Sequence, residues 1–432
     1  MWAMRFALCL QIGLLFAQVA EAQSTQPDRP YRGLFGQRTR DPKGREQLVD
    51  FTMTLSDAYD DNRINDAEAS ASNLPLTPSG MHSNVDAAVR YTRGRREERR
   101  LSLTGGSALR YEPQLDHLLT ANYQGTVAFT SPLWHGSRLD VSQGAAYTPY
   151  YQLQLFPTIS VEAADAPPRQ STDYAIWQQP AYTFNSAIVF SQNFSVRTGL
   201  QLAYDRRNVM FTGQAQDLLT DGASVKFTHR FTRSLGIHLG LGTRTALYGG
   251  VASPNVVRVQ DIDIGIDSGR SISLSRRTTL SFSTGSSLIP QGDKYYYRVT
   301  GDASLRREIG RTWTANLQYS RGLRFIEAVP YPFLSDSVSA GVRGNLNRRW
   351  DLGASGGYSN GQVGVIATNG TYGTYTGSAQ LGVSITRHYA LYSEYVFYHY
   401  LFTQESVAGA FPARLDRNTA RIGLKLWFPL LD

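Results

Sequence analysis

Thiols and long apolar runs are almost absent from this sequence of 432 residues. The single cysteine, Cys9, lies in a leader-like stretch, so the mature chain would have no disulfide, thiolate metal site or cysteine nucleophile. The seven histidines are scattered without a His-x-x-x-His pair, and no metal site is predicted. After residue 22 no stretch approaches the roughly 18 apolar residues of a membrane-spanning helix. Helical membrane spans are therefore excluded.

Residues 1–22 contain the one sustained apolar run. A single positive charge, Arg5, precedes this run, and small residues close it. We therefore expect a secretory signal peptide that is cleaved before Gln23. A retained membrane anchor is the alternative, but the run is short and is interrupted by Gln11 and Gln18.

The rest of the chain divides at about residue 46. Residues 23–46 are polar and contain proline, and we expect a flexible periplasmic N-terminal segment there. Residues 47–432 carry the strand pattern and are predicted to form the β-barrel. A TonB-dependent transporter would need a large plug domain before its first strand, so that class is excluded.

The clearest strand pattern spans residues 336–358. Apolar and polar residues alternate there, with a break at Arg348 and Arg349. A period of two is typical of a strand, so this segment predicts two strands joined by a tight, charged turn. Each arm has about 10 residues, which is enough to cross a bilayer when the strand is tilted.

Eight hairpins of this kind lie between a first strand near residues 47–56 and a last strand at residues 417–428. The total is about 18 strands, with 16 as the alternative, joined by short periplasmic turns and longer extracellular loops. The fifth hairpin loses its alternation because Ser268 and Arg270 share the isoleucine parity. We expect either a bulge near Asp267 to Gly269 or an Arg270 side chain that reaches the membrane interface. The hairpin spacing also resembles a β-propeller repeat, but the arms are too long for propeller blades.

Charged residues alternate with the apolar ones on many strands. Such a face has too many ionisable groups for the core of a soluble sandwich, so the apolar face must be covered, and only lipid can cover it. The chain is therefore predicted to be all-β, a transmembrane antiparallel up-and-down β-barrel of the bacterial outer membrane. The predicted pore-lining residues are Asp86, Arg90, Arg197, Lys226, Arg244, Asp263, Arg298, Asp302, Arg343, Arg417, Arg421 and Lys425.

Basic residues are in modest excess, with 43 Lys and Arg against 35 Asp and Glu. A weak anion preference is expected if the pore is open. The long loop at residues 157–179 is a candidate constriction loop. Its charged and proline residues are Pro157, Glu162, Asp165, Arg169 and Asp173.

Other site chemistries are weaker interpretations. Asp261, Asp263 and Asp267 share a parity and could bind a cation, although a polar lumen wall is favoured. Residues 59–62 offer oxygen atoms for calcium but lack the glycine-containing spacing of a calcium loop, so a plain loop is favoured. Serine and aspartate are too common for a Ser/His or Asp/His pair to be informative, and no enzyme activity or cofactor is predicted. The arginines are dispersed over the turns, which disfavours nucleic-acid binding.

Three motifs carry a family resemblance. They are Ala58-Tyr59-Asp60-Asp61-Asn62, the turns of the type Ser275-Arg276-Arg277, and the closing Gly423-Leu424-Lys425-Leu426-Trp427. With them the chain resembles the β-barrel porin family found beside exopolysaccharide genes in bacteria. The resemblance implies a role in moving extracellular polysaccharide across the outer membrane, and no catalytic residues. The chain departs from the usual barrel-assembly signal, because Phe428 is followed by four more residues instead of ending the chain.

Three functions therefore stay open. A conduit for secreted polysaccharide would have inward aromatic residues and a periplasmic polysaccharide-export partner. Tyr392, Tyr398 and Tyr400 could stack on sugars, although a membrane-interface girdle is the favoured interpretation. A general diffusion porin would have a loop folded into the pore, and a structural barrel would only display loops. In each case the expected partners are outer-membrane lipid, lipopolysaccharide and the barrel-assembly machinery, and no nucleic acid.

Overall fold

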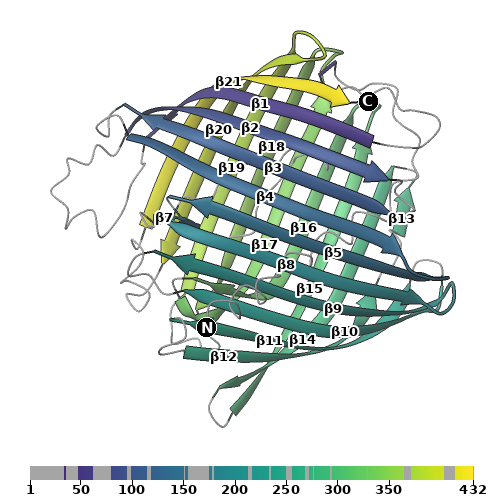
Figure 1. The fold of residues 1–432 in the computed structure, drawn as a ribbon. Coiled ribbons are helices and arrows are strands. Elements are labelled where there is room, and N and C mark those ends of the chain that lie inside the picture. The colour runs from purple at the N-terminus through teal and green to yellow at the C-terminus, as the bar shows by residue number, and fades with distance from the viewer. Residues whose placement is uncertain are drawn as a thin grey trace, which may run out of the picture.

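One large antiparallel sheet that closes on itself makes up most of the protein (Figure 1). This arrangement is seen in a computed structural model. The described residues are 34–35, 47–61, 79–94, 99–113, 118–149, 151–153, 175–177, 180–212, 217–232, 235–249, 255–267, 272–275, 277–291, 294–327, 329–363, 371–402 and 414–431. The predicted signal peptide and most of the predicted N-terminal segment lie outside these residues. No helix in the described ranges is long and apolar enough to cross a membrane.

The strands of the large sheet follow one another along the chain. They are β1 (Gln47–Asp60), β2 (Gly80–Gly94), β3 (Arg100–Glu112), β4 (Leu118–Pro132), β5 (Ser137–Thr148), β8 (Ala181–Asn193), β9 (Thr198–Phe211), β10 (Leu218–Arg230), β11 (Gly236–Tyr248), β12 (Asn255–Asp267), β13 (Ile272–Ser275), β14 (Thr278–Gln291), β15 (Lys294–Ile309), β16 (Trp313–Ile326), β17 (Val329–Asn345), β18 (Trp350–Val363), β19 (Thr371–Ser384), β20 (Tyr389–Phe402) and β21 (Arg414–Leu431). Two short strands, β6 (Tyr151–Leu153) and β7 (Ala175–Trp177), form a separate pair.

Eighteen strand positions close the barrel. Each strand pairs with its neighbours in sequence, and β1 pairs with both β2 and β21. The large sheet contains nineteen labelled strands, but β12 and β13 both pair with β14 and share one position. The prediction of an eighteen-stranded antiparallel barrel is thus confirmed. Short turns lie at the end where β1 begins and β21 ends, and longer connections lie at the other.

A register shift lies just before the bulge predicted at residues 267–269 of the fifth hairpin. The β12–β14 register shifts between Asp261 and Asp267, and β13 pairs with β14 from Ile272. A register shift of this kind lets a strand remain paired on both sides of the point where its alternation is interrupted. The residues between Asp267 and Ile272 lie outside the described part of the chain.

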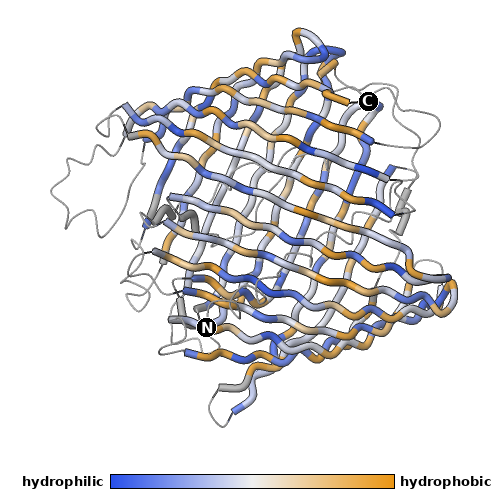
Figure 2. The backbone as a smooth tube through the Cα atoms, in the orientation of Figure 1, coloured by the Kyte–Doolittle hydropathy of each residue, from blue (hydrophilic) through white to orange (hydrophobic). Residues whose placement is uncertain are grey.

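Alternation of side chains divides each strand between two faces, as Figure 2 shows along the tubes. On β11, Ile237, Leu239 and Leu241 are 45%, 50% and 57% exposed, whereas His238 and Ala246 are 2% and 0% exposed. The apolar parity is thus the outer one, which is the reverse of a soluble protein. A barrel of this kind needs an apolar surrounding for its outer face.

The seam between β1 and β21 is held by side chains as well as by the backbone ladder. Nε of Arg417 donates to Oδ1 of Asp60 at 2.7 Å, and the Thr419 hydroxyl donates to the same oxygen at 2.6 Å. Arg417 and Asp60 are each only 1% exposed. Next to them, the backbone nitrogen of Asn418 donates to Oδ1 of Asp61 at 2.6 Å. Neither the calcium nor the plain-loop interpretation holds for Asp60, because it ends β1 and its carboxylate binds Arg417.

Replacing Arg417 by methionine should leave the Asp60 carboxylate buried without its partner. Loss of one member of a buried ion pair costs about 3–5 kcal/mol, so we expect the barrel to unfold at a lower temperature. The change from folded to unfolded mobility on unboiled SDS gels, followed against temperature, measures this. Asp60→Asn together with Arg417→Met should recover part of the loss. A single variant as heat-resistant as the parent would contradict the role given to the pair.

Candidate functional site

The interior of the barrel is identified by contacts between strands that are not neighbours. Nη1 of Arg244 in β11 donates to the carbonyl oxygen of Leu323 in β16 at 3.1 Å. The Arg244 guanidinium carbon also lies 6.0 Å from the centre of the Phe325 ring. Since β12, β14 and β15 separate β11 from β16 in the sheet, these contacts cross the enclosed space. The face that carries Arg244 is therefore the inner face.

The predicted pore-lining residues, with one exception, lie on strands at inner-face positions. They alternate with exposed apolar residues such as Val89 and Val225, which are 43% and 45% exposed. Arg197 is the exception, because β9 begins only at Thr198 and Arg197 lies in the exposed turn before it. The side-chain alternation of β9 therefore does not include Arg197.

Several inner-face charges lie near groups of opposite sign. Arg343 is 3.6 Å from Asp351, and Arg421 is 3.8 Å from Glu394. Arg417 differs from them, because it is buried in the β1–β21 seam and presents no charge to the lumen. Among the described residues, the inner wall is thus polar and carries charges of both signs.

Two of the three aspartates of β12, Asp261 and Asp263, have protein partners. Asp261 accepts hydrogen bonds from Nε and Nη2 of Arg244 at 2.7 and 2.9 Å. Oδ1 of Asp263 lies 3.0 Å from Nε2 of His238. The described residues contain no group of three or more potential ligands that could hold a metal ion. These contacts fit the favoured interpretation of a polar wall.

The hairpin between β16 and β17 leaves the barrel wall at the long-connection end. Pairing of β15 with β16 stops at Gly301 and Arg321, whereas β15 continues to pair with β14 as far as Lys294. Beyond this point β16 stays paired with β17 up to Ile326 and Val329. We call residues 322–334 the inner hairpin. Its backbone separates from β15 and enters the interior.

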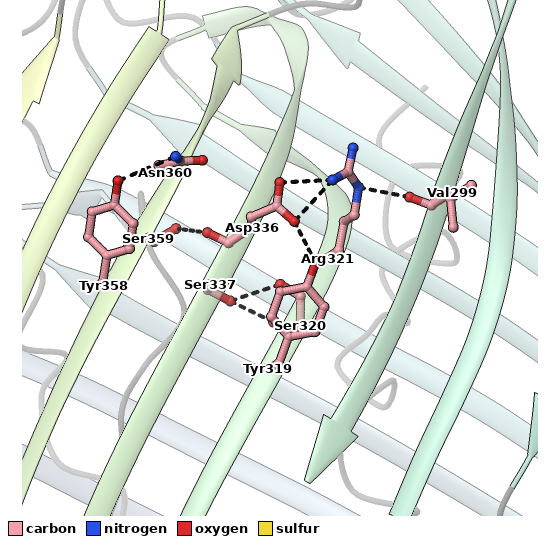
Figure 3. Close-up of polar contacts among 9 residues, drawn as sticks. All are labelled: Val299, Tyr319, Ser320, Arg321, Asp336, Ser337, Tyr358, Ser359 and Asn360. Atoms are coloured by element: carbon pink, nitrogen blue, oxygen red, sulfur yellow. Dashed lines mark hydrogen bonds and ion pairs between the residues drawn. The ribbon is translucent and has the colours of Figure 1, made fainter.

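Arg321 closes the gap where β15 and β16 part (Figure 3). Its Nε donates to the Val299 carbonyl oxygen at 3.0 Å, and its Nη1 lies 3.2 and 3.1 Å from the two carboxylate oxygens of Asp336. The Tyr319 hydroxyl donates to Asp336 at 2.7 Å. The base of the inner hairpin is therefore fixed to both β15 and β17, and the carbonyl freed by the separation keeps a donor.

Apolar side chains seat the inner hairpin against the nearby wall strands β12 and β14. Leu323 and Leu334 form a buried cluster with Val259 of β12 and Ile289 of β14, and all four are at most 7% exposed. Ile326 is 1% exposed. Burial of a Leu, Ile or Val side chain contributes about 1.5–3 kcal/mol, so the cluster holds the inner hairpin firmly.

An ion pair fixes the tip of the inner hairpin. Glu327, at the turn, is 2% exposed and pairs with Arg207 of β9. A buried carboxylate needs such a partner, because an unpaired charge away from water is costly. Arg244 of β11 and Arg207 of β9 thus hold the inner hairpin from the inner face of the wall beyond β12. The inner hairpin therefore has defined contacts at its base, middle and tip.

The sequence placed the candidate constriction on a different loop. Pro157, Glu162, Asp165, Arg169 and Asp173 lie outside the described residues. A signal for the inner hairpin was present, because residues 323–334 have apolar side chains at both parities. A wall strand between lipid and water would have them at one parity only. Loss of alternation at a strand end marks backbone that is buried on both sides.

The girdle interpretation is wrong for Tyr392, Tyr398 and Tyr400. All three lie at the inner-face parity of β20 and are 6%, 1% and 0% exposed, whereas the alternate residue Tyr395 is 48% exposed. Nζ of Lys425 lies 4.7 Å from the centre of the Tyr392 ring. These aromatic groups therefore line the inside of the wall.

No protein-family model matches the chain, and no curated protein matches it in sequence. Among solved structures it is similar to OccK2 (OpdF) of Pseudomonas aeruginosa, crystallised in complex with glucuronate, with 10% identity, a TM-score of 0.45 and coverage of 93% of this chain and 100% of that one. The chain is also similar to OccAB4 of Acinetobacter baumannii, with 10% identity, a TM-score of 0.45 and coverage of 90% of this chain and 100% of that one. A third similar structure is the FrpB iron transporter of Neisseria meningitidis, with 9% identity, a TM-score of 0.44 and coverage of 89% of this chain and 83% of that one. These likenesses concern the fold alone, and the description of the barrel rests on its strand pairing.

The sequence contains no cysteine after Cys9, so an introduced cysteine permits a direct test of the inner hairpin. A cysteine in place of Val259 should resist a water-soluble maleimide in the intact protein, because the inner hairpin covers it. Replacing residues 323–334 by a short Gly-Ser turn removes Leu323 and Leu334 and should make it reactive. Lys226→Cys, on the inner face away from the inner hairpin, is the control and should react in both backgrounds. Equal labelling at position 259 with and without the inner hairpin would show that it is not seated there.

Proposed function

We propose that the protein is a channel of the bacterial outer membrane that provides a hydrophilic path for polar solutes. The observation that carries this proposal is the division of one closed wall into an apolar outer face and a charged inner face. A bilayer can cover the outer face, because every wall strand finds its backbone partners within the closed sheet. The signal peptide predicted at residues 1–22 supports the same destination.

For the solute we propose secreted polysaccharide. The inward tyrosines of β20 support it, because aromatic rings provide apolar faces and hydroxyl groups together. The resemblance of the motifs at residues 58–62 and 423–427 to the exopolysaccharide-associated barrels supports it as well. In this proposal the protein works with a periplasmic polysaccharide-export partner and performs no catalysis. A structural barrel that displays loops would make no use of the inward aromatic groups.

Bilayer recordings of the purified protein test this function. We expect stepwise conductance that oligosaccharides from the secreted polymer block with submillimolar affinity. Phenylalanine in place of Tyr392 should weaken the block while leaving the conductance in simple salt unchanged, because only the hydroxyl is removed. Phenylalanine at the outer-face Tyr395 is the control. Large ohmic steps that sugars do not affect would favour the general diffusion porin, and no conductance at all would favour the structural barrel.

The alternative function is a general diffusion porin with a weak anion preference. The charges of the inner wall support this anion preference. The basic side chains Lys226, Arg298 and Arg343 share the inner face with the acidic Asp263, Asp302 and Asp351, and Arg343 lies 3.6 Å from Asp351, so the net effect is small. Reversal potentials in a salt gradient should show a slight anion preference, and Lys226→Glu should shift the potential toward cations. A clear cation preference in the parent protein would overturn this prediction.

A further inference from the structure

The short-turn rim of the barrel repeats one pairing of residue types. In four turns an exposed aromatic residue lies one to three positions from an arginine. The pairs are Phe194 with Arg197 (β8–β9), Phe231 with Arg230 (β10–β11), Trp350 with Arg349 (β17–β18) and Tyr389 with Arg387 (β19–β20). The aromatic residues are 63%, 57%, 40% and 41% exposed, in that order. The four turns occupy two opposite sectors of the rim.

Each of these aromatic residues has the outer-face parity of its strand. Phe194 continues the parity of Ile188, and Phe231 that of Phe227, both of which are exposed on the outer wall. The aromatic rings therefore stand where the apolar band of the wall ends. Arg349 and Arg387 lie in the turns just beyond their aromatic partners, whereas Arg230 ends β10 one residue before Phe231. Within the described residues none of the four arginines has an acidic partner.

The opposite rim is built differently. There the outer-face tyrosines donate to side chains of the next strand, as Tyr204 does to Asp221 at 3.0 Å and Tyr319 to Asp336 at 2.7 Å. The arginines beside them are also paired, as Arg206 is with Asp221. Among the described residues, these arginines beside the tyrosines have acidic partners, whereas the four arginines of the aromatic-bearing short turns have none. The short-turn rim also contains the pair Arg138–Asp140, so the contrast concerns these four turns.

We propose that the short-turn rim is a binding surface for anionic phospholipid headgroups. An aromatic ring rests at the level of the headgroups, and a guanidinium one turn position further out can donate two hydrogen bonds to a lipid phosphate. An anionic lipid then supplies the charge that this rim lacks. The inference goes beyond channel function to lipid preference, and it rests on the membrane location proposed above.

The outer-face position of the aromatic partners favours lipid over an acidic polymer passing through the lumen. A polymer at the channel mouth would meet the arginines without the outward rings. Lipid headgroups meet both at once, because they surround the wall. The rim therefore matches the periplasm-facing leaflet when the short turns point to the periplasm.

Electron spin resonance with spin-labelled lipids tests the proposal on the whole protein in phosphatidylcholine vesicles. The parent barrel should bind spin-labelled phosphatidylglycerol in preference to spin-labelled phosphatidylcholine. Arg349→Gln with Arg387→Gln should reduce that preference roughly two- to five-fold. Arg258→Gln with Lys294→Gln removes the same charge from exposed positions near the other end and is the matched control. It should leave the preference nearly unchanged.

Three outcomes would overturn the proposal. The parent could show no preference for phosphatidylglycerol, or both double variants could reduce it equally, which would indicate net charge alone. Alternatively, an acidic polysaccharide could bind the detergent-solubilised parent and lose affinity in the Arg349/Arg387 variant while the lipid preference stays intact. Channel conductance is measured separately, so a protein without lipid preference that still conducts would leave the proposed function standing.

Discussion

The need to pair every backbone amide and carbonyl within the wall is the constraint on which the structure depends. A sheet with free edges would expose those groups to hydrocarbon, so the first and last strands must meet. β1 and β21 do meet, over nearly the whole length of β1. The seam places the two sequence motifs from the chain ends on neighbouring strands, offset along the seam, since Gly423 pairs with Ser56 and Asp60 with Thr419. The buried Asp60–Arg417 pair then fixes the register of β1 against β21 where β1 ends and β21 begins.

Closure also explains where irregular backbone is allowed. A strand that leaves the wall outward would lose its partners to lipid, but one that turns inward can find partners in the protein. The inner hairpin follows this rule, with Arg321 supplying the donor at its base and Arg207 and Arg244 holding its tip and middle. The apolar cluster around Val259 and Leu323 then replaces the lost ladder with side-chain packing. The interior is therefore shaped by one part of the wall itself.

The sequence predicted the wall well, because alternation reports directly on a surface that separates lipid from water. It gave the eighteen strands, and it located the fault near Asp267. It did not identify the inner hairpin, since packing between Leu323 and Val259 joins segments that are distant in sequence and carries no period. It also wrongly favoured a membrane-interface girdle for Tyr398 and Tyr400, because aromatic residues of a strand occur both in such girdles and on the inner face of the wall. Their parity relative to Tyr395 was the only signal, and it lay within a strand in which aromatics occur at both parities.

The central claim is that the outer parity contacts lipid and the inner parity contacts water. Nitroxide labels on cysteines at Val127 and Thr126, which are adjacent and both exposed in the middle of β4, test it most directly in reconstituted vesicles. Collisions with oxygen should dominate at position 127, and collisions with a water-soluble nickel chelate should dominate at position 126. Equal collision rates for the two reagents at both positions, or the reverse order, would contradict the account.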